Sequence, residues 1–162
     1  MSKNTRVILA KRPVDDATPD CFSVETVEDE ALEPGQVRVA VEYISVDAGT
    51  RTMLRGEGFH AQVDLGQTIL AGGVGRIIES TVDGWDKGQA VRGGLGAQTI
   101  ATVMPKMLEK VDDTVGSLSA HLGALGASTG VTSWIGVRKV AKPRPGDIFV
   151  VSAAAGAGGS IA

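Results

Sequence analysis

The chain has 162 residues and a formal net charge of −3, with 22% charged residues. This balance provides no positive field that would hold nucleic acid or anionic lipid, so neither is an expected partner. The length suffices for one domain of ordinary size, or for one domain and part of another. Glycine is the outlying residue, with 22 occurrences, about twice the usual share. We therefore expect frequent turns and close approaches between backbone segments.

Cysteine and histidine are too scarce for a disulfide or a zinc site. Cys21 has no second cysteine to pair with, and His60 and His121 are the only histidines. The chain is therefore expected to be intracellular, specifically cytoplasmic, and to bind no metal. Residues 114–137 carry no charged side chain, but their many hydroxyl groups and glycines argue against a membrane span. We expect a buried, tightly packed helical segment there instead.

The first two thirds of the chain predict β-structure. Residues 36–45 form the clearest strand, with Val37, Val39, Val41 and Tyr43 alternating on one face. The other strand candidates, separated by glycine-containing turns, are residues 6–10, 22–27, 74–80, 90–92, 98–103 and 107–111. Many short strands with glycine at the corners indicate a small, strongly bent barrel or sandwich.

The pattern changes to helical spacing after residue 117. Leu118, Leu122 and Leu125 form one apolar stripe, and a second stripe begins at Val131 and includes Trp134, Ile135 and Arg138. We therefore predict two helices. Residues 142–147, which contain two prolines and a glycine, end the second helix. Residues 148–151 are continuously apolar, which predicts a strand buried on both faces of a parallel sheet.

A glycine-rich segment, residues 152–162, follows this predicted strand. A buried strand, a glycine-rich turn and the start of a helix form the first unit of a dinucleotide-binding domain. In the pattern G-x-G-x-x-G the matching residues are Ala154, Gly156 and Gly159, so the first glycine is replaced. A purely structural turn would account for the segment as well. Because a parallel strand needs parallel neighbours, we expect the chain to be the N-terminal portion of a larger protein.

Four blocks of the sequence resemble one family. They are Ile44-Ser45-Val46-Asp47, Val74-Gly75-Arg76-Ile77-Ile78-Glu79-Ser80, Gly130-Val131-Thr132-Ser133-Trp134-Ile135-Gly136 and Ser152-Ala153-Ala154-Ala155-Gly156-Ala157-Gly158-Gly159-Ser160. The chain resembles the N-terminal half of zinc-independent medium-chain dehydrogenases/reductases, and among them the NADPH-dependent double-bond reductases that act on alkenals, curcumin or prostaglandins. Members of this family carry Ala-Ala-x-Gly-x-x-Gly in place of the triple-glycine pattern, which accounts for Ala154.

The resemblance implies a mainly β, GroES-like bent barrel followed by helices and the first strand of a truncated α/β Rossmann domain. The GroES-like catalytic domain would comprise residues 1–125. The connecting helix and the start of the NADP-binding domain would comprise residues 126–162. The active site of such an enzyme lies between the two domains.

The resemblance also assigns residues to the site. Asp47, Gly49 and Arg51 would line the substrate cleft, with Gly49 in the place of a family tyrosine. The residues that would contact NADPH are Thr132, Ala155, Gly156, Ala157 and Gly159. No residue is expected to act as a catalytic acid or base, because these enzymes transfer a hydride from NADPH to the activated C=C bond of an enone, an alkenal or a quinone.

Two functional interpretations are open. In the first, the chain is part of an NADP-dependent oxidoreductase that acts on a small molecule as a homodimer, although the isolated 162-residue chain is inactive. In the second, it is a truncated non-catalytic fragment that serves at most as a binding or dimerisation module.

Several of these residues also have ordinary structural explanations. Asp47 could cap a short helix at residues 48–55, and Arg51 could form a surface ion pair. Thr132 could bond to a backbone carbonyl one turn earlier. His121 is expected to be a packed helix residue, and His60 to lie in a surface loop.

Overall fold

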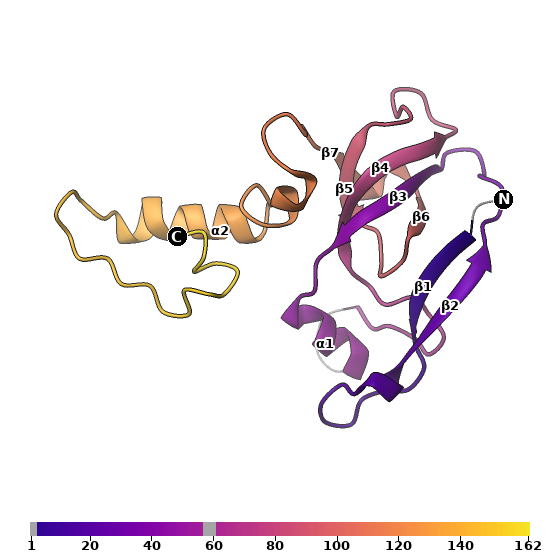
Figure 1. Cartoon of the computed structure of the whole chain (residues 1–162), viewed down its shortest axis with the longest axis horizontal. Coiled ribbons are helices and arrows are strands. Elements are labelled where there is room, and N and C mark those ends of the chain that lie inside the picture. The colour runs from indigo at the N-terminus through magenta and orange to yellow at the C-terminus, as the bar shows by residue number, and fades with distance from the viewer. Residues whose placement is uncertain (1–2, 57–60) are drawn as a thin grey trace.

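The computed structural model describes residues 3–56 and 61–162. It has two parts, a β-domain and an arm that extends from it (Figure 1). The β-domain contains the N-terminal strands, and the arm contains the last helices and the C-terminal turn. This division places the predicted substrate residues and the predicted nucleotide residues on different parts of the molecule.

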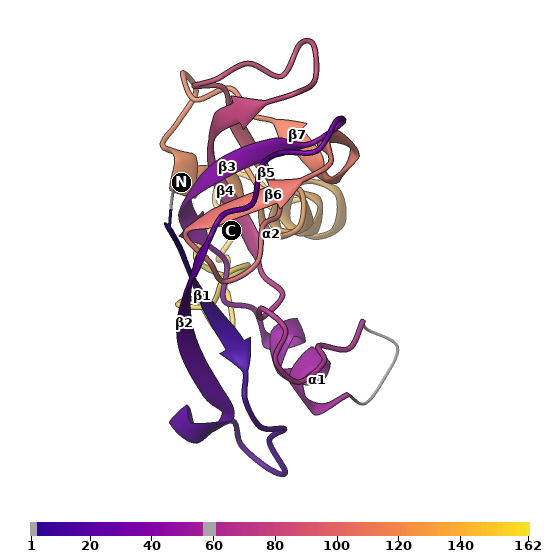
Figure 2. The same ribbon diagram turned by 90° about the vertical axis from the view of Figure 1, so that its right-hand side faces the viewer.

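The β-domain is built from two antiparallel sheets. Strand β1 (Lys3–Leu9) pairs with β2 (Phe22–Glu28). The larger sheet has the order β6-β3-β4-β5-β7, and its strands are β3 (Val37–Ile44), β4 (Gly72–Ser80), β5 (Ala90–Gly94), β6 (Ile100–Val103) and β7 (Leu108–Lys110). Bridges from Arg6 to Gln98 and from Ile8 to Thr68 join the sheets, and Figure 2 shows β1 and β2 turning away from the larger sheet. The bent β-architecture predicted from the sequence is confirmed, with strand ends shifted by a few residues.

The core forms where the apolar faces of the strands meet. Val37 and Val39 of β3 are fully buried, and they belong to the same cluster as Ile77 and Val91. The predicted alternation along β3 holds as far as Val41, which packs against this cluster. A register shift between residues 41 and 43 then leaves Tyr43 50% exposed, because a bulge redirects the side chains that follow it.

Close backbone approaches explain part of the glycine excess. A Cβ atom on Gly75 in β4 would lie 2.0 Å from the carbonyl oxygen of Ala40 in the neighbouring strand. A Cβ atom on Gly93 in β5 would lie 2.3 Å from the carbonyl oxygen of Met107. Any side chain at these positions would therefore push two strands apart.

The arm begins with a short 3-10 helix, η3 (Leu118–Leu122), which packs on β4. Leu118 of η3 is buried with Val74 and Ala90. An α-helix, α2 (Thr129–Ile135), follows and continues into a π-helix, η4 (Gly136–Ala141). Two helical segments are thus present, as predicted, and the first is fixed to the sheet by its apolar residues.

The expectation of a tightly packed second helix is wrong. Val131 is 49% exposed, Trp134 54% and Ile135 44%, and within α2 the buried residues are Gly130 and Ser133. The reason is the direction of the helix, which leads away from the β-domain (Figure 1). Its apolar stripe therefore faces no layer of the described protein.

The buried strand predicted at residues 148–151 is also not formed. Ile148 is 94% exposed and Val150 84% exposed. An extended segment becomes a strand only by hydrogen bonding to a neighbour, and within the described residues no segment pairs with this one. Residues 152–161, where the start of a helix was expected, form a series of turns.

Candidate functional site

Helix α1 (Ala48–Arg55) carries the predicted substrate residues. It begins after Asp47 and ends at Gly56, whose φ of 74° is in the left-handed region favoured by glycine. Leu54 anchors it in the core of the β-domain. The helix bounds agree with the capping interpretation of Asp47, but the Asp47 side chain makes no capping hydrogen bond. Its carboxylate is therefore not tied up by the helix.

An apolar cavity of about 450 Å³ lies beside α1. Of the three residues assigned to the substrate cleft, Asp47 and Arg51 contribute to the wall of this cavity and Gly49 does not. Gly49 lies on α1 with open space around it, since a Cβ atom built there would meet no atom of the described residues within 4 Å outside the neighbouring residues and the helix backbone. The remaining lining residues are Asp16, Ala17, Phe22, Ile44, Ser45, Val46, Thr50, Leu54, Ile69, Leu70, Ala71 and Ala97.

The mouth of this apolar cavity carries an ion pair. The guanidinium of Arg51 donates a hydrogen bond to the carboxylate of Asp16. Their side chains are 57% and 82% exposed, respectively. Arg51 therefore lines this cavity and also forms a surface ion pair.

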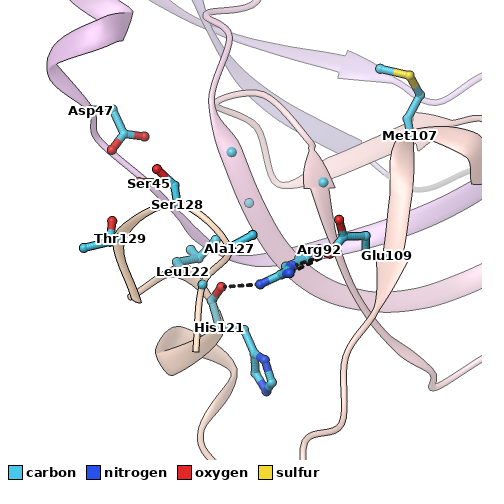
Figure 3. Close-up of a pocket in the computed structure, with 14 residues that line it drawn as sticks. Ser45, Asp47, Arg92, Met107, Glu109, His121, Leu122, Ala127, Ser128 and Thr129 are labelled. Carbon is cyan, nitrogen blue, oxygen red and sulfur yellow. Dashed lines mark hydrogen bonds and ion pairs between the residues drawn. The ribbon is translucent and has the colours of Figure 1, made fainter. Parts of the chain in front are cut away.

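A second, more polar cavity of about 290 Å³ adjoins the first, and Ser45 and Asp47 line both. Its walls come from the segment after β3, from β4, β5 and β7, and from the start of the arm (Figure 3). Arg92 lies in this wall and donates two hydrogen bonds to Glu109, at 2.8 and 2.6 Å. It also donates to the carbonyl oxygens of His121 and Leu125, each at 3.2 Å. Arg92 thus connects the sheet to the start of the arm.

His121 is a packed residue, as predicted. It is 7% exposed, and its Nε2 lies 3.1 Å from the carbonyl oxygen of Asp112. The side chain of Asp112 accepts hydrogen bonds from the hydroxyl and the backbone N–H of Thr114, which lower the pKa of that carboxyl below its ordinary value. Cys21 is a buried free thiol, 2% exposed. His60 lies outside the described residues.

The predicted nucleotide residues lie on the arm. Thr132 is exposed on α2. The hydrogen bond to a backbone carbonyl one turn earlier, proposed above for Thr132, is made by the neighbouring Ser133. The Ser133 hydroxyl lies 2.9 Å from both the carbonyl oxygen of Thr129 and that of Gly158. This contact attaches the glycine-rich turn to α2. Within the described residues, neither Thr132 nor the turn lines either cavity.

The backbone of the glycine-rich turn fits a phosphate-bearing cofactor such as NADPH. A Cβ atom on Gly159 would lie 2.4 Å from the carbonyl oxygen of Ala153, so the turn requires glycine there. Ala155, Gly156 and Ala157 are exposed. The N–H groups of Ala155 and Ala157 make no hydrogen bond within the described residues, whereas that of Gly156 bonds to Ala153 at 2.8 Å. Free N–H groups next to glycine are the usual donors to phosphate.

The described residues contain neither a metal-binding cluster nor a helix able to span a membrane. Within residues 3–56 and 61–162, no group of three or more His, Cys, Asp or Glu side chains is placed to hold a metal ion. Over the same ranges, no helix is both long and apolar enough to cross a membrane.

Several residues of the two cavities were not predicted from the sequence. Ser45 adjoins Asp47 and could have been found as its neighbour. Asp16 and Phe22 belong to a segment far from α1 in the sequence, and Arg92 lies in a strand recognised only by its apolar neighbours. No local spacing connects these positions, because the fold alone brings them together.

The protein-family model described as the N-terminal domain of oxidoreductase matches residues 5–111 of this chain. The chain therefore belongs to this family, and its β-domain has the GroES-like fold of the medium-chain dehydrogenases/reductases. The matched range covers all seven strands of the described β-domain except the first two residues of β1.

The individual relatives agree with this assignment. The NADPH-dependent curcumin reductase of Escherichia coli is 32% identical over 157 residues, covering 95% of this chain and 45% of that protein. Prostaglandin reductase 1 of Bos taurus is 32% identical over 157 residues, which are 94% of this chain and 45% of that protein. The crystal structure of CurA from Vibrio vulnificus superposes with a TM-score of 0.79 at 27% identity, covering 98% of this chain and 47% of that chain. The chain thus spans about half the length of the relatives it matches.

Proposed function

We propose that the chain is the substrate-side portion of an NADPH-dependent reductase that reduces the activated C=C bond of an enone, an alkenal or a quinone. The observation that carries this proposal is the apolar cavity of about 450 Å³ beside α1, with Asp47 and Arg51 in its wall. The named activities of the curcumin and prostaglandin reductases support it.

The cavity suits a substrate with a hydrocarbon body and one polar group. Phe22, Leu54 and Ile69 provide apolar surface to cover the hydrocarbon. The hydroxyls of Ser45 and Thr50 lie in the same wall and could donate hydrogen bonds to a substrate carbonyl oxygen. Such donors would stabilise negative charge that develops on this oxygen during reduction.

Of the charged or titratable side chains that line the polar cavity, Arg92, Glu109 and His121 are held in structural contacts, whereas within the described residues Asp47 is not. Arg92 is bonded to Glu109, and the His121 ring is bonded to a backbone carbonyl. This arrangement agrees with a reaction that requires positioning of the substrate and no dedicated acid–base pair. When bound, NADPH would supply the hydride; Ala155, Gly156, Ala157 and Gly159 would hold its phosphates by their backbone, and Thr132 would lie nearby.

A chimera tests the proposal. The 157 aligned residues of the Escherichia coli curcumin reductase would be replaced by this chain, and NADPH oxidation would be followed with medium-chain enones. We expect enone-dependent oxidation, which Ala71→Trp should abolish by filling the apolar cavity. Ala31→Trp is the matched control, because Ala31 is exposed and lies outside that cavity. A folded chimera without enone-dependent oxidation would contradict the proposal.

We further propose that the isolated chain neither binds NADPH tightly nor turns over. The exposure of the glycine-rich turn and of residues 148–150 supports this view, since no second layer covers the phosphate-binding side. Calorimetric titration of the chain with NADPH should show no binding tighter than the millimolar range. Micromolar binding would refute this part of the proposal.

The exposed apolar face of the arm also favours association into a homodimer. Val131, Trp134, Ile148 and Phe149 are each between 44% and 94% exposed, and apolar surface of this kind is usually covered by a partner. Light scattering of the chain should give twice the monomer mass of 16.7 kDa. A monomer at all concentrations would contradict dimerisation.

A further inference from the structure

Among the described residues, those with charged side chains in the wall of the apolar cavity are Asp16, Asp47 and Arg51. These two carboxylates and one guanidinium together carry one net negative charge. The only cation of the set is already paired, since Arg51 donates to Asp16. Within the described residues, the Asp47 carboxylate makes no hydrogen bond or ion pair, so an entering carboxylate would meet its charge and would have to compete with Asp16 for Arg51.

Asp16 is held in this position by the surrounding chain. Arg55 donates a hydrogen bond to the carbonyl oxygen of Val14 at 2.7 Å. Arg12 donates to the carbonyl oxygens of Leu54 and Val63, at 3.1 and 2.9 Å. These bonds fasten the segment that contains Asp16 to α1 and its surroundings. The backbone on either side of Asp16 is thus held near α1, and the Asp16 carboxylate, 82% exposed, lies in the cavity wall through its ion pair with Arg51.

We propose that Asp16 is a specificity-determining residue, which makes the cavity select neutral enones and alkenals and reject substrates that carry a carboxylate. This inference rests on the proposed substrate cavity and adds the charge class of the substrate. The physical reason is that discrimination can come from an unfavourable contact with the wrong ligand, here a like charge placed beside the cation. Removing the Asp16 charge leaves Arg51 available to pair with a substrate carboxylate.

The test measures binding to the 162-residue chain by NMR titration, with a medium-chain enone that ends either in a methyl ester or in the free carboxylate. Exposed ion pairs contribute little energy, so we expect the ester to bind wild type about two- to fivefold more tightly. Asp16→Asn should remove this difference, and Asp16→Lys should reverse it. High salt should weaken the preference of the wild type. Asp15→Asn is the matched control, because Asp15 is exposed but does not line this cavity.

The outcomes separate the two levels of the proposal. If the ester binds and the preference is unchanged in both Asp16 variants, the specificity role is overturned and the cavity remains the substrate site. If Asp15→Asn acts as strongly as Asp16→Asn, overall charge explains the preference, and the role of Asp16 is again overturned. If neither ligand binds, the substrate cavity itself is refuted, and the specificity role with it.

Discussion

Replacing Arg92 by methionine should loosen the start of the arm while leaving the β-domain folded. Arg92 extends from β5 and bonds to Glu109 on one side and to the carbonyl oxygens of His121 and Leu125 on the other. These two carbonyls belong to the segment that precedes α2 and forms one wall of the polar cavity. Methionine keeps much of the apolar stem of arginine and removes all of these hydrogen bonds.

The expected cost follows from the exposure of the groups. The Arg92 side chain is 21% exposed and that of Glu109 is 66% exposed, so solvent screening limits the ion pair to less than about 1 kcal/mol. Each bond to a carbonyl contributes roughly 0.5–1.5 kcal/mol, and at 3.2 Å these two belong near the lower end. We therefore expect a loss of about 2 kcal/mol, felt mainly in residues 118–129.

Hydrogen exchange read by mass spectrometry, together with urea unfolding, would measure this loss. The matched control is Arg76→Met, because Arg76 also bonds to a carboxylate and a carbonyl, at Asp113 and Gly88, but not to the arm. Arg92→Met should raise exchange in residues 118–129 well above the level of the control. If both variants exchange alike in this segment, the connecting role of Arg92 is refuted.

Three further predictions concern the turn, the sheet and the pH dependence. Ser133→Ala should increase amide exchange in the glycine-rich turn, because it removes the 2.9 Å hydrogen bond that joins this turn to α2. The unfolding of the β-domain should not change. Gly75→Ala should destabilise the β-domain by about 2–3 kcal/mol in urea, since the new Cβ would overlap the carbonyl oxygen of Ala40; unchanged stability would contradict the close approach. Hydrogen bonds from Thr114 hold the folded-state pKa of Asp112 below its ordinary value of 3.8. The ionised carboxylate therefore adds to the free energy of unfolding above pH 3.8, and this contribution is lost as the pH falls through the lowered pKa. Asp112→Asn should reduce the decrease in the free energy of unfolding between pH 5 and pH 2, measured by urea unfolding. An unchanged decrease would contradict the role of Asp112.

Most of the β-domain could be predicted because its strands carry their own signals. Residues 36–45 alternate in polarity, and the structure places a strand at Val37–Ile44. Glycine-containing turns separate the other strands, so the positions of these strands along the chain could be predicted. The pairing order β6-β3-β4-β5-β7 was not readable, because pairing depends on contacts between residues distant in sequence.

Two of the wrong predictions share a physical cause. The stripe on α2 and the apolar run at residues 148–151 both indicate burial, yet Trp134 is 54% exposed and Ile148 94% exposed. An apolar pattern encodes a need for a partner surface and does not supply that surface. Within the described residues, no layer is present to cover either segment.

The two predicted substrate residues that line the apolar cavity are close together in the sequence. Asp47 and Arg51 lie one turn apart at the start of a short helix, and both line the apolar cavity. Asp16 pairs with Arg51 across 35 positions of sequence. No motif of the chain indicated Asp16, although it contributes a carboxylate to the cavity wall. Sequence motifs thus indicate the part of a site that one element carries.

The glycine-rich turn and its position relative to the cavities are controlled by different interactions. Its shape is local, because the close approach of Gly159 to Ala153 and the bond from Gly156 need no sheet beside them. Its position depends on a chain of contacts that runs from Arg92 through the start of the arm to Ser133. The shape of the turn and its distance from the apolar cavity are therefore set by separate contacts, the second of which includes the two carbonyls held by Arg92.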